Sequence, residues 1–233
     1  MSKLQESQHL SNPLSRDRYQ SVLFLFFLLF FAGSCISPPY RQFLLMQHVP
    51  TVLAALLLAY LSNRFVIGRW SFSSIILFLC LHTLGARYLY SYVPYDVWSE
   101  KLLGVTVSEV FGFQRNHYDR VVHFSYGLLL AVPVQEFERR YLRLSKVMSS
   151  LLALEFILAT SAGYELIEWL VAVVFTPRWA EQFLGQQGDI FDAQKDTALA
   201  TAGAAVSICV MALTDQWRSK VAQRRAAGRQ PSV

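Results

Sequence analysis

The sequence predicts an all-α integral membrane protein, a bundle of about six transmembrane helices. Hydrophobic residues make up 54% of the 233 positions and charged residues only 16%, whereas soluble domains carry about 25% charged residues. The apolar residues gather into six long runs that do not alternate with polar residues as strands do. Every backbone polar group inside lipid must be bonded internally, so runs of this kind favour helices.

The six apolar segments predict the helices in order, because a helix that spans a bilayer needs about 20 mostly apolar residues. The first segment (SVLFLFFLLFFAGSCIS) and the fourth are close to the lower limit of length, and the fifth is long. The expected helices are residues 21–37, 44–62, 70–92, 120–137, 147–175 and 191–214. We expect one transmembrane domain over 21–214, between an N-terminal tail over 1–20 and a basic tail over 215–233.

The distribution of basic residues predicts the orientation. Lys and Arg are concentrated in both tails and in the connections after the second and fourth segments, and they are sparser in the other connections. Cytoplasmic loops carry this excess, so both termini are expected in the cytoplasm of a bacterial inner membrane. The basic C-terminal tail is interpreted as an anchor on anionic membrane lipids. Nucleic acid is not expected as a partner, since no aromatic or folded reader accompanies the charges.

Polar and ionisable side chains interrupt four of the expected helices on the non-cytoplasmic side. They are His82, Arg87 and Tyr88 in the third segment, Asp119 and His123 in the fourth, Glu165 and Glu168 in the fifth, and Asp189, Asp192, Lys195 and Asp196 around the start of the sixth. Successive helices reverse direction, so these residues fall at a similar depth although they are far apart in the sequence.

The spacing of these residues predicts that they face one another. Asp119 and His123 are four residues apart, and the three aspartates of GDIFDAQKD follow an i, i+3, i+7 pattern, which is one stripe of a helix. A charged group at the centre of a membrane helix costs roughly 2.5 to 3.5 kcal/mol when it faces lipid. The stripes are therefore expected to turn inward and to line a polar cavity.

A divalent cation is one way to hold these acids together. Five carboxylates in one cavity repel each other unless protons, basic side chains or a metal ion neutralise them. Oxygen ligands suit Mg²⁺, Ca²⁺ or Mn²⁺, and an added imidazole extends the choice to Fe²⁺ or Zn²⁺. The candidate metal ligands are Glu165, Glu168, Asp189, Asp192 and Asp196.

The remaining polar residues are assigned to catalysis and substrate binding. His123 and Asp119 are candidate catalytic residues, with His123 or a carboxylate as general base. His82, Arg87, Tyr88 and Lys195 are candidate substrate-binding residues, and the basic ones are suited to an anionic head group. A structural interpretation stays open, in which the aspartates cap helices and Arg87, Arg120 and Lys195 neutralise the acids.

Four motifs in one order resemble a known family. The stretches HTLGARYLYSYVP, YDRVVHFSYGLLLAVPVQE, GYELIEW and FLGQQGDIFDAQKD are similar to those of the YjdF family of bacterial inner-membrane proteins, over roughly residues 20 to 215. The resemblance implies a helical inner-membrane protein and supplies no activity. DRVVHFSYGLLL alone also resembles one helix of VanZ-like membrane proteins.

Two enzyme families share part of the aspartate motif. DIFDAQKD has the DxxDxxxD spacing of intramembrane prenyltransferases, and GDIFDAQKD resembles half of the signature of the CDP-alcohol phosphotransferases. The second aspartate-rich motif of the first family and the DGxxAR half of the second are missing here.

Two functions therefore compete for the predicted cavity. The first is a metal-dependent enzyme that acts on a lipid or an envelope precursor. The second is a proton- or cation-coupled transporter or ion-binding module. A structural or accessory membrane protein is a third alternative. The aromatic and charged connection over 93–118 is expected to lie at the outer interface, either as a connector or as a lid over the cavity.

Overall fold

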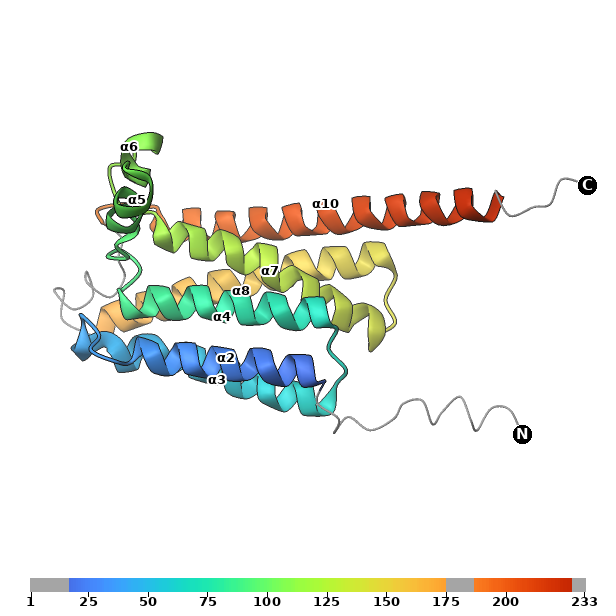
Figure 1. Cartoon of the computed structure of the whole chain (residues 1–233), viewed down its shortest axis with the longest axis horizontal. Coiled ribbons are helices and arrows are strands. Elements are labelled where there is room, and N and C mark those ends of the chain that lie inside the picture. Colours follow the sequence, from blue (N-terminus) through green and yellow to red (C-terminus); the bar gives the residue numbers. More distant parts are fainter. Residues whose placement is uncertain (1–16, 175–186, 228–233) are drawn as a thin grey trace, which may run out of the picture.

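The computed structural model describes residues 17–174 and 187–227, and the regular elements within those ranges are all α-helices (Figure 1). The tail residues 1–16 and 228–233 and the connection 175–186 lie outside the described ranges. The long helices are α2 (Arg18–Ser34), α3 (Arg41–Arg64), α4 (Arg69–Arg87), α7 (Tyr118–Arg140), α8 (Lys146–Val174) and α10 (Asp192–Ala227). The short helices α5 (Tyr95–Leu103) and α6 (Val107–Phe111) stand at one end of the bundle.

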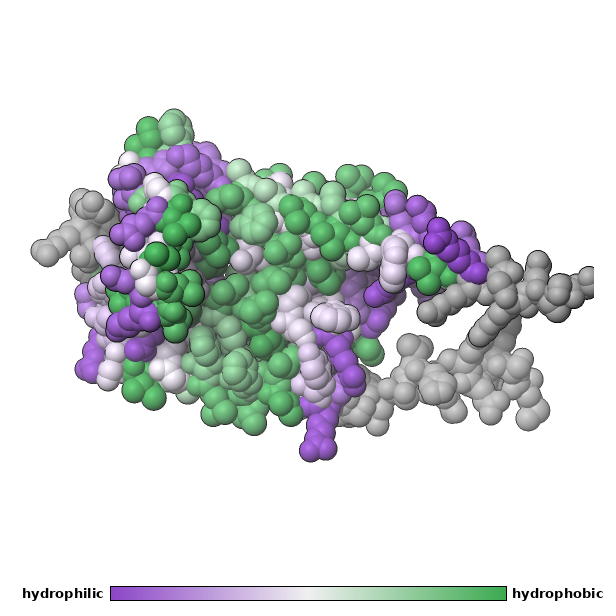
Figure 2. All heavy atoms as spheres, turned by 45° about the horizontal axis from the view of Figure 1, so that its top comes forward, coloured by the Kyte–Doolittle hydropathy of each residue, from purple (hydrophilic) through white to green (hydrophobic). Residues whose placement is uncertain are grey.

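The predicted all-α membrane bundle is confirmed. Of the described helices, α3, α4, α8 and α10 are long and apolar enough to cross a bilayer, and α2 is apolar but shorter at 17 residues. Helix α7 is 23 residues long and runs beside them, but it carries acidic and basic residues in its first and last turns. Figure 2 shows hydrophobic residues over the middle of the visible face of the bundle, with hydrophilic residues gathered at both ends.

Helix α4 ends at Arg87 rather than at the expected residue 92, because the chain reverses immediately after it. Leu89 and Tyr90 have φ angles of 52° and 53°, in the left-handed region where L-residues cannot continue a helix. The reversal places the Tyr90 ring back over α4. Gly85 permits this contact, since a Cβ there would lie 2.5 Å from two carbons of that ring.

Helix α10 continues well beyond the expected boundary at residue 214. The segment DQWRSKVAQRRAA contains no Gly or Pro and is rich in Ala, Arg, Lys and Gln, which favour helices in water as well as in lipid. The described part of the basic tail is therefore a helical extension of the last transmembrane segment.

Helices α7 and α10 run in the same direction and pack with their backbones in close contact. Both begin at the end of the bundle where α5 and α6 stand (Figure 1). A Cβ at Gly127 would overlap the Ala200 carbonyl, and a Cβ at Gly203 would overlap the Phe124 carbonyl. Small residues at such contacts let membrane helices approach closely, where dispersion contacts stabilise the pair.

The connection between α4 and α7 folds into α5 and α6. Thr106 and Glu109 form a capping box at the start of α6. The Asp96 carboxylate accepts hydrogen bonds from the backbone N–H and the hydroxyl of Ser108, at 2.9 and 2.6 Å, and so joins the two helices. Leu102 and Phe111 are exposed. These apolar side chains suit an interfacial position, which stays a prediction.

Candidate functional site

The packing of α7 against α10 brings the polar ends of both helices to one depth. Each helix carries two ionisable residues four positions apart and then small residues continuing on the same face. The stripes are Asp119, His123, Gly127 and Ala131 on α7, and Asp192, Asp196, Ala200 and Ala204 on α10. Because the helices are parallel and in contact at the small residues, the α7 acid and imidazole lie opposite the acids of α10.

His123 is at the centre of a cluster of acids from three helices. Its Nε2 lies 3.6 Å from Asp119 Oδ1 and 3.5 Å from Glu165 Oε1 on α8. One potential ligand atom from each of Asp119, His123 and Asp196 lies within 4.8 Å of the other two.

Two carboxylate oxygens of this cluster are buried without a hydrogen-bond partner among the described residues. They are Asp196 Oδ1 and Glu165 Oε1, and Asp196 is only 2% exposed. Burying an uncompensated carboxylate is costly, so such groups bind a proton, a basic side chain or a metal ion. The cluster therefore needs positive charge.

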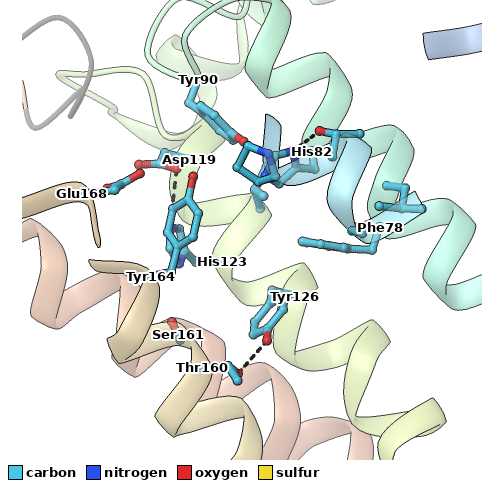
Figure 3. A pocket seen from close by; sticks show the side chains of 15 residues that line it. Phe78, His82, Tyr90, Asp119, His123, Tyr126, Thr160, Ser161, Tyr164 and Glu168 are labelled. Atoms are coloured by element: carbon cyan, nitrogen blue, oxygen red, sulfur yellow. Dashed lines mark hydrogen bonds and ion pairs between the residues drawn. The ribbon is translucent and has the colours of Figure 1, made fainter. Parts of the chain in front are cut away.

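A cavity of about 190 Å³ lies beside the cluster, between α3, α4, α7 and α8 (Figure 3). Asp119 and His123 belong to both the cluster and the cavity lining. The other polar and aromatic lining residues are Thr51, Phe78, His82, Tyr90, Tyr126, Thr160, Ser161, Tyr164 and Glu168. Figure 3 shows the Asp119 and Glu168 carboxylates close together at one end, and Phe78 and Tyr126 away from them.

Asp189 and Asp192 belong to a separate group of ion pairs just outside the cluster. Arg115 Nη2 lies 2.9 Å from Asp192 Oδ1, and Arg120 Nη2 lies 2.5 Å from Asp189 Oδ2. Lys195 Nζ lies 2.6 Å from the same Asp189 oxygen. The hydrogen bond from Lys195, with weaker help from the Phe191 N–H and Arg120, lowers the pKa of Asp189 to about 2. These two acids already have basic partners.

The expected substrate-binding residues are divided between the cavity and other roles. His82 lines the cavity, and its Nδ1 lies 2.9 Å from the Thr51 hydroxyl. Arg87 points away and donates to the carbonyls of Ser34, Ile36 and Ser37 at the end of α2. The centre of the Tyr88 ring lies 5.6 Å from the guanidinium carbon of Arg87.

Of the expected metal ligands, Asp196 belongs to the trio with Asp119 and His123, and Glu165 lies next to that trio. Glu168 lines the cavity.

Several cavity residues were not among the sequence candidates. Ser161, Tyr164 and Glu168 have i, i+3, i+7 spacing, so the stripe that contains Glu168 could have revealed the first two. Tyr90 could not have been found this way, because it reaches the cavity only through the left-handed turn after α4. Arg115 lies in a connection, and no periodic pattern connects it with Asp192.

Comparisons with known proteins agree with this architecture. Residues 19–216 match the family described as "Predicted membrane protein (DUF2238)". The chain is 33% identical over 194 residues to "Inner membrane protein YjdF" of Escherichia coli (strain K12), across 82% of this chain and 87% of that protein. No solved structure gives a significant match.

Proposed function

We propose a cation-dependent function for this chain, which belongs to the YjdF family of multi-pass inner-membrane proteins. Asp119, His123 and Asp196 bind a divalent cation, and the protein acts as an enzyme on the polar part of a lipid or an envelope precursor. The site faces the outer side of the membrane, with both termini in the cytoplasm. This orientation rests on the excess of Lys and Arg at the opposite end of the bundle.

The observation that carries the proposal is the buried Asp196 carboxylate. It has an oxygen with no hydrogen-bond partner in the described ranges, and a carboxylate and an imidazole lie within 4.8 Å of its ligand atom. Two carboxylates and one imidazole favour Mn²⁺, Fe²⁺ or Zn²⁺ over the all-oxygen sites that suit Mg²⁺ and Ca²⁺. Three protein ligands leave open positions for water or substrate, as in catalytic metal sites.

The chemistry follows from the neighbours of the trio. A cation held by Asp119, His123 and Asp196 would supply Lewis-acid chemistry, by polarising a carbonyl or phosphoryl oxygen or by lowering the pKa of a water. Glu165 is suited to accept the proton of that water, since its Oε1 lies 3.5 Å from His123 and has no hydrogen-bond partner among the described residues. The adjoining cavity holds the head group of the substrate.

Metal binding by the purified protein tests the proposal. Detergent-purified protein is expected to retain Mn²⁺ or Zn²⁺ at about one ion per chain after dialysis. Asp196→Asn should weaken binding more than about 100-fold, since even residues outside the coordination shell contribute roughly 10- to 100-fold. Asp192→Asn is the matched control one helical turn away. It is expected to keep the ion, because Asp192 is paired with Arg115. Absence of metal from the wild type would refute the site.

A proton-coupled carrier is a second candidate, favoured by one specific observation. Asp119 and His123 line the cavity, whereas Glu165 lines a groove of about 880 Å³ between α8 and α10. Asp119, His123 and Glu165 therefore form a series of proton-binding groups, 3.6 and 3.5 Å apart, that leads from the cavity to the groove. Reconstitution into proteoliposomes distinguishes the two functions. A carrier would let protons enter and acidify the lumen under a proton gradient, and His123→Ala would abolish this proton flux. An enzyme shows no such flux.

A further inference from the structure

The charge of the cavity beside the cluster indicates the kind of ligand it accepts. Among the described residues, its lining includes Asp119 and Glu168 but no Lys or Arg. The described basic side chains nearby are engaged elsewhere. Arg87 caps α2, and Lys195, like Arg115 and Arg120, pairs with Asp189 or Asp192. Two neighbouring, partly buried carboxylates disfavour an anionic ligand and favour a cationic one.

Aromatic rings form much of the cavity wall. Tyr126 and Phe78 lie 5.3 Å apart between ring centres, Phe78 and His82 lie 5.9 Å apart, and His82 and Tyr90 lie 5.7 Å apart, all with steeply inclined planes. Tyr164 rises from α8 on the other side, below the two carboxylates (Figure 3). Cages of this kind attract organic ammonium ions through the negative faces of the rings.

Two hydroxyl groups in the cavity are also buried without a hydrogen-bond partner among the described residues. They belong to Tyr90, which is 9% exposed, and Ser161, which is 3% exposed. Other hydroxyls of the lining are satisfied, since Tyr126 bonds Thr160 at 2.6 Å and Thr51 bonds His82. Unpaired buried hydroxyls are costly, so a ligand with N–H or O–H groups would gain by pairing with them.

The volume sets the size of the ligand. A cavity of about 150 Å³ in another protein accommodates one benzene molecule, and this cavity measures about 190 Å³. It therefore suits a small head group, such as a two-carbon amino alcohol or its quaternary analogue, and excludes a sugar nucleotide or a peptide.

We propose that this cavity binds an organic ammonium group, with Asp119 and Glu168 as counter-ions, Tyr90 and Tyr164 as the aromatic cage, and the Tyr90 hydroxyl as a polar partner. The inference rests on the proposed function, because it names the substrate class of the same site. The ammonium belongs either to a free amine or to the head group of an amine-bearing lipid.

Calorimetric titration of the detergent-purified, Mn²⁺-loaded protein tests the inference. Ethanolamine and choline are expected to bind, and 3,3-dimethylbutanol, the uncharged analogue of choline, is expected to bind at least about tenfold more weakly. Glu168→Gln should weaken choline binding at least about tenfold, as expected when a charge-assisted contact is lost. Tyr90→Phe should weaken ethanolamine by a smaller factor. Asp192→Asn, which alters an acid outside the cavity lining that is paired with Arg115, should leave choline binding unchanged.

The outcomes separate the two proposals. Equal binding of choline and its neutral analogue, or an unchanged affinity in Glu168→Gln, would overturn the ammonium assignment. Retention of Mn²⁺ without ammonium binding would refute this inference alone. If the purified protein bound ammonium ions but retained no Mn²⁺, the cation-dependent enzyme would be refuted instead. Nanodiscs of phosphatidylethanolamine compared with phosphatidylglycerol identify the source, because a lipid ligand competes with choline only in the first.

Discussion

At the scale of single residues, two neighbouring aspartates on α10 have different surroundings. Asp192 is paired with Arg115 at 2.9 Å, whereas Asp196, one turn further along, has a buried oxygen without a hydrogen-bond partner among the described residues. The DxxDxxxD spacing by itself does not distinguish Asp192 from Asp196. The basic partner comes from a connection far away in the sequence, so only the folded chain distinguishes the paired acid from the one available to a cation.

Gly85 leaves room for the ring of Tyr90, which lines the cavity. Gly85→Ala introduces a Cβ 2.5 Å from the Tyr90 ring, which is held by the left-handed turn and cannot move freely. We expect it to lower the free energy of unfolding by about 1 to 3 kcal/mol, as overpacking does, and to weaken choline binding. Thermal unfolding in detergent and calorimetry measure both effects.

Gly33→Ala is the control for this substitution, because no described residue has an atom within 4 Å of a Cβ at that helical glycine. It is expected to be neutral or slightly stabilising, since Ala favours a helix interior over Gly. Equal stability of the two variants would show that Tyr90 does not pack on Gly85.

At the scale of elements, the contact between α7 and α10 sets the geometry of the acidic cluster. Gly127→Ala places a Cβ against the Ala200 backbone carbonyl, and a backbone atom cannot yield as a flexible side chain does. The helices must separate, so the unfolding temperature should fall and the affinity for Mn²⁺ should drop at least about tenfold, as for loss of outer-shell support. Differential scanning fluorimetry and metal titration measure these changes.

The matched control is Gly163→Ala on α8, where a Cβ would have no atom of the described part of the chain within 4 Å. This variant should unfold at or above the wild-type temperature and keep its metal affinity. If Gly127→Ala bound Mn²⁺ as the wild type does, the register of α7 against α10 could not be what aligns the ligands.

At the scale of the whole molecule, the orientation in the membrane decides which compartment the cavity serves. The polar cluster and α5 and α6 lie at one end of the bundle, and α2 begins and α10 ends at the other (Figure 1). In a background with Cys35, Cys80 and Cys209 replaced by Ser, we expect an impermeant maleimide to label Val105→Cys in intact cells. Ser219→Cys should react only after the inner membrane is opened.

Both test positions are exposed in the fold, so differences in labelling report the side of the membrane rather than burial. The reverse pattern of labelling would place the cavity on the cytoplasmic side and contradict the orientation inferred from the basic residues.

The sequence alone determined the class of the protein and the order of its helices. Apolar runs of sufficient length impose helices in lipid whatever their neighbours, because backbone groups there have no other hydrogen-bond partners. The helical spacing of Asp119 and His123, and the aspartate stripe that contains Asp196, also predicted residues that do meet. These are local properties, and they can be read from residues within two or three turns of each other.

The tertiary structure alone decided which polar groups share a site. Arg115 pairs with Asp192 from a connection without periodicity, Arg87 turns to the end of α2, and Tyr90 enters the cavity after a reversal that shortens α4. The position of Tyr90 depends on backbone angles that residue type does not dictate, and the α7–α10 contact depends on the close approach of the helices at Gly127 and Gly203. Contacts between distant segments are set by packing, whose energy belongs to the folded chain as a whole.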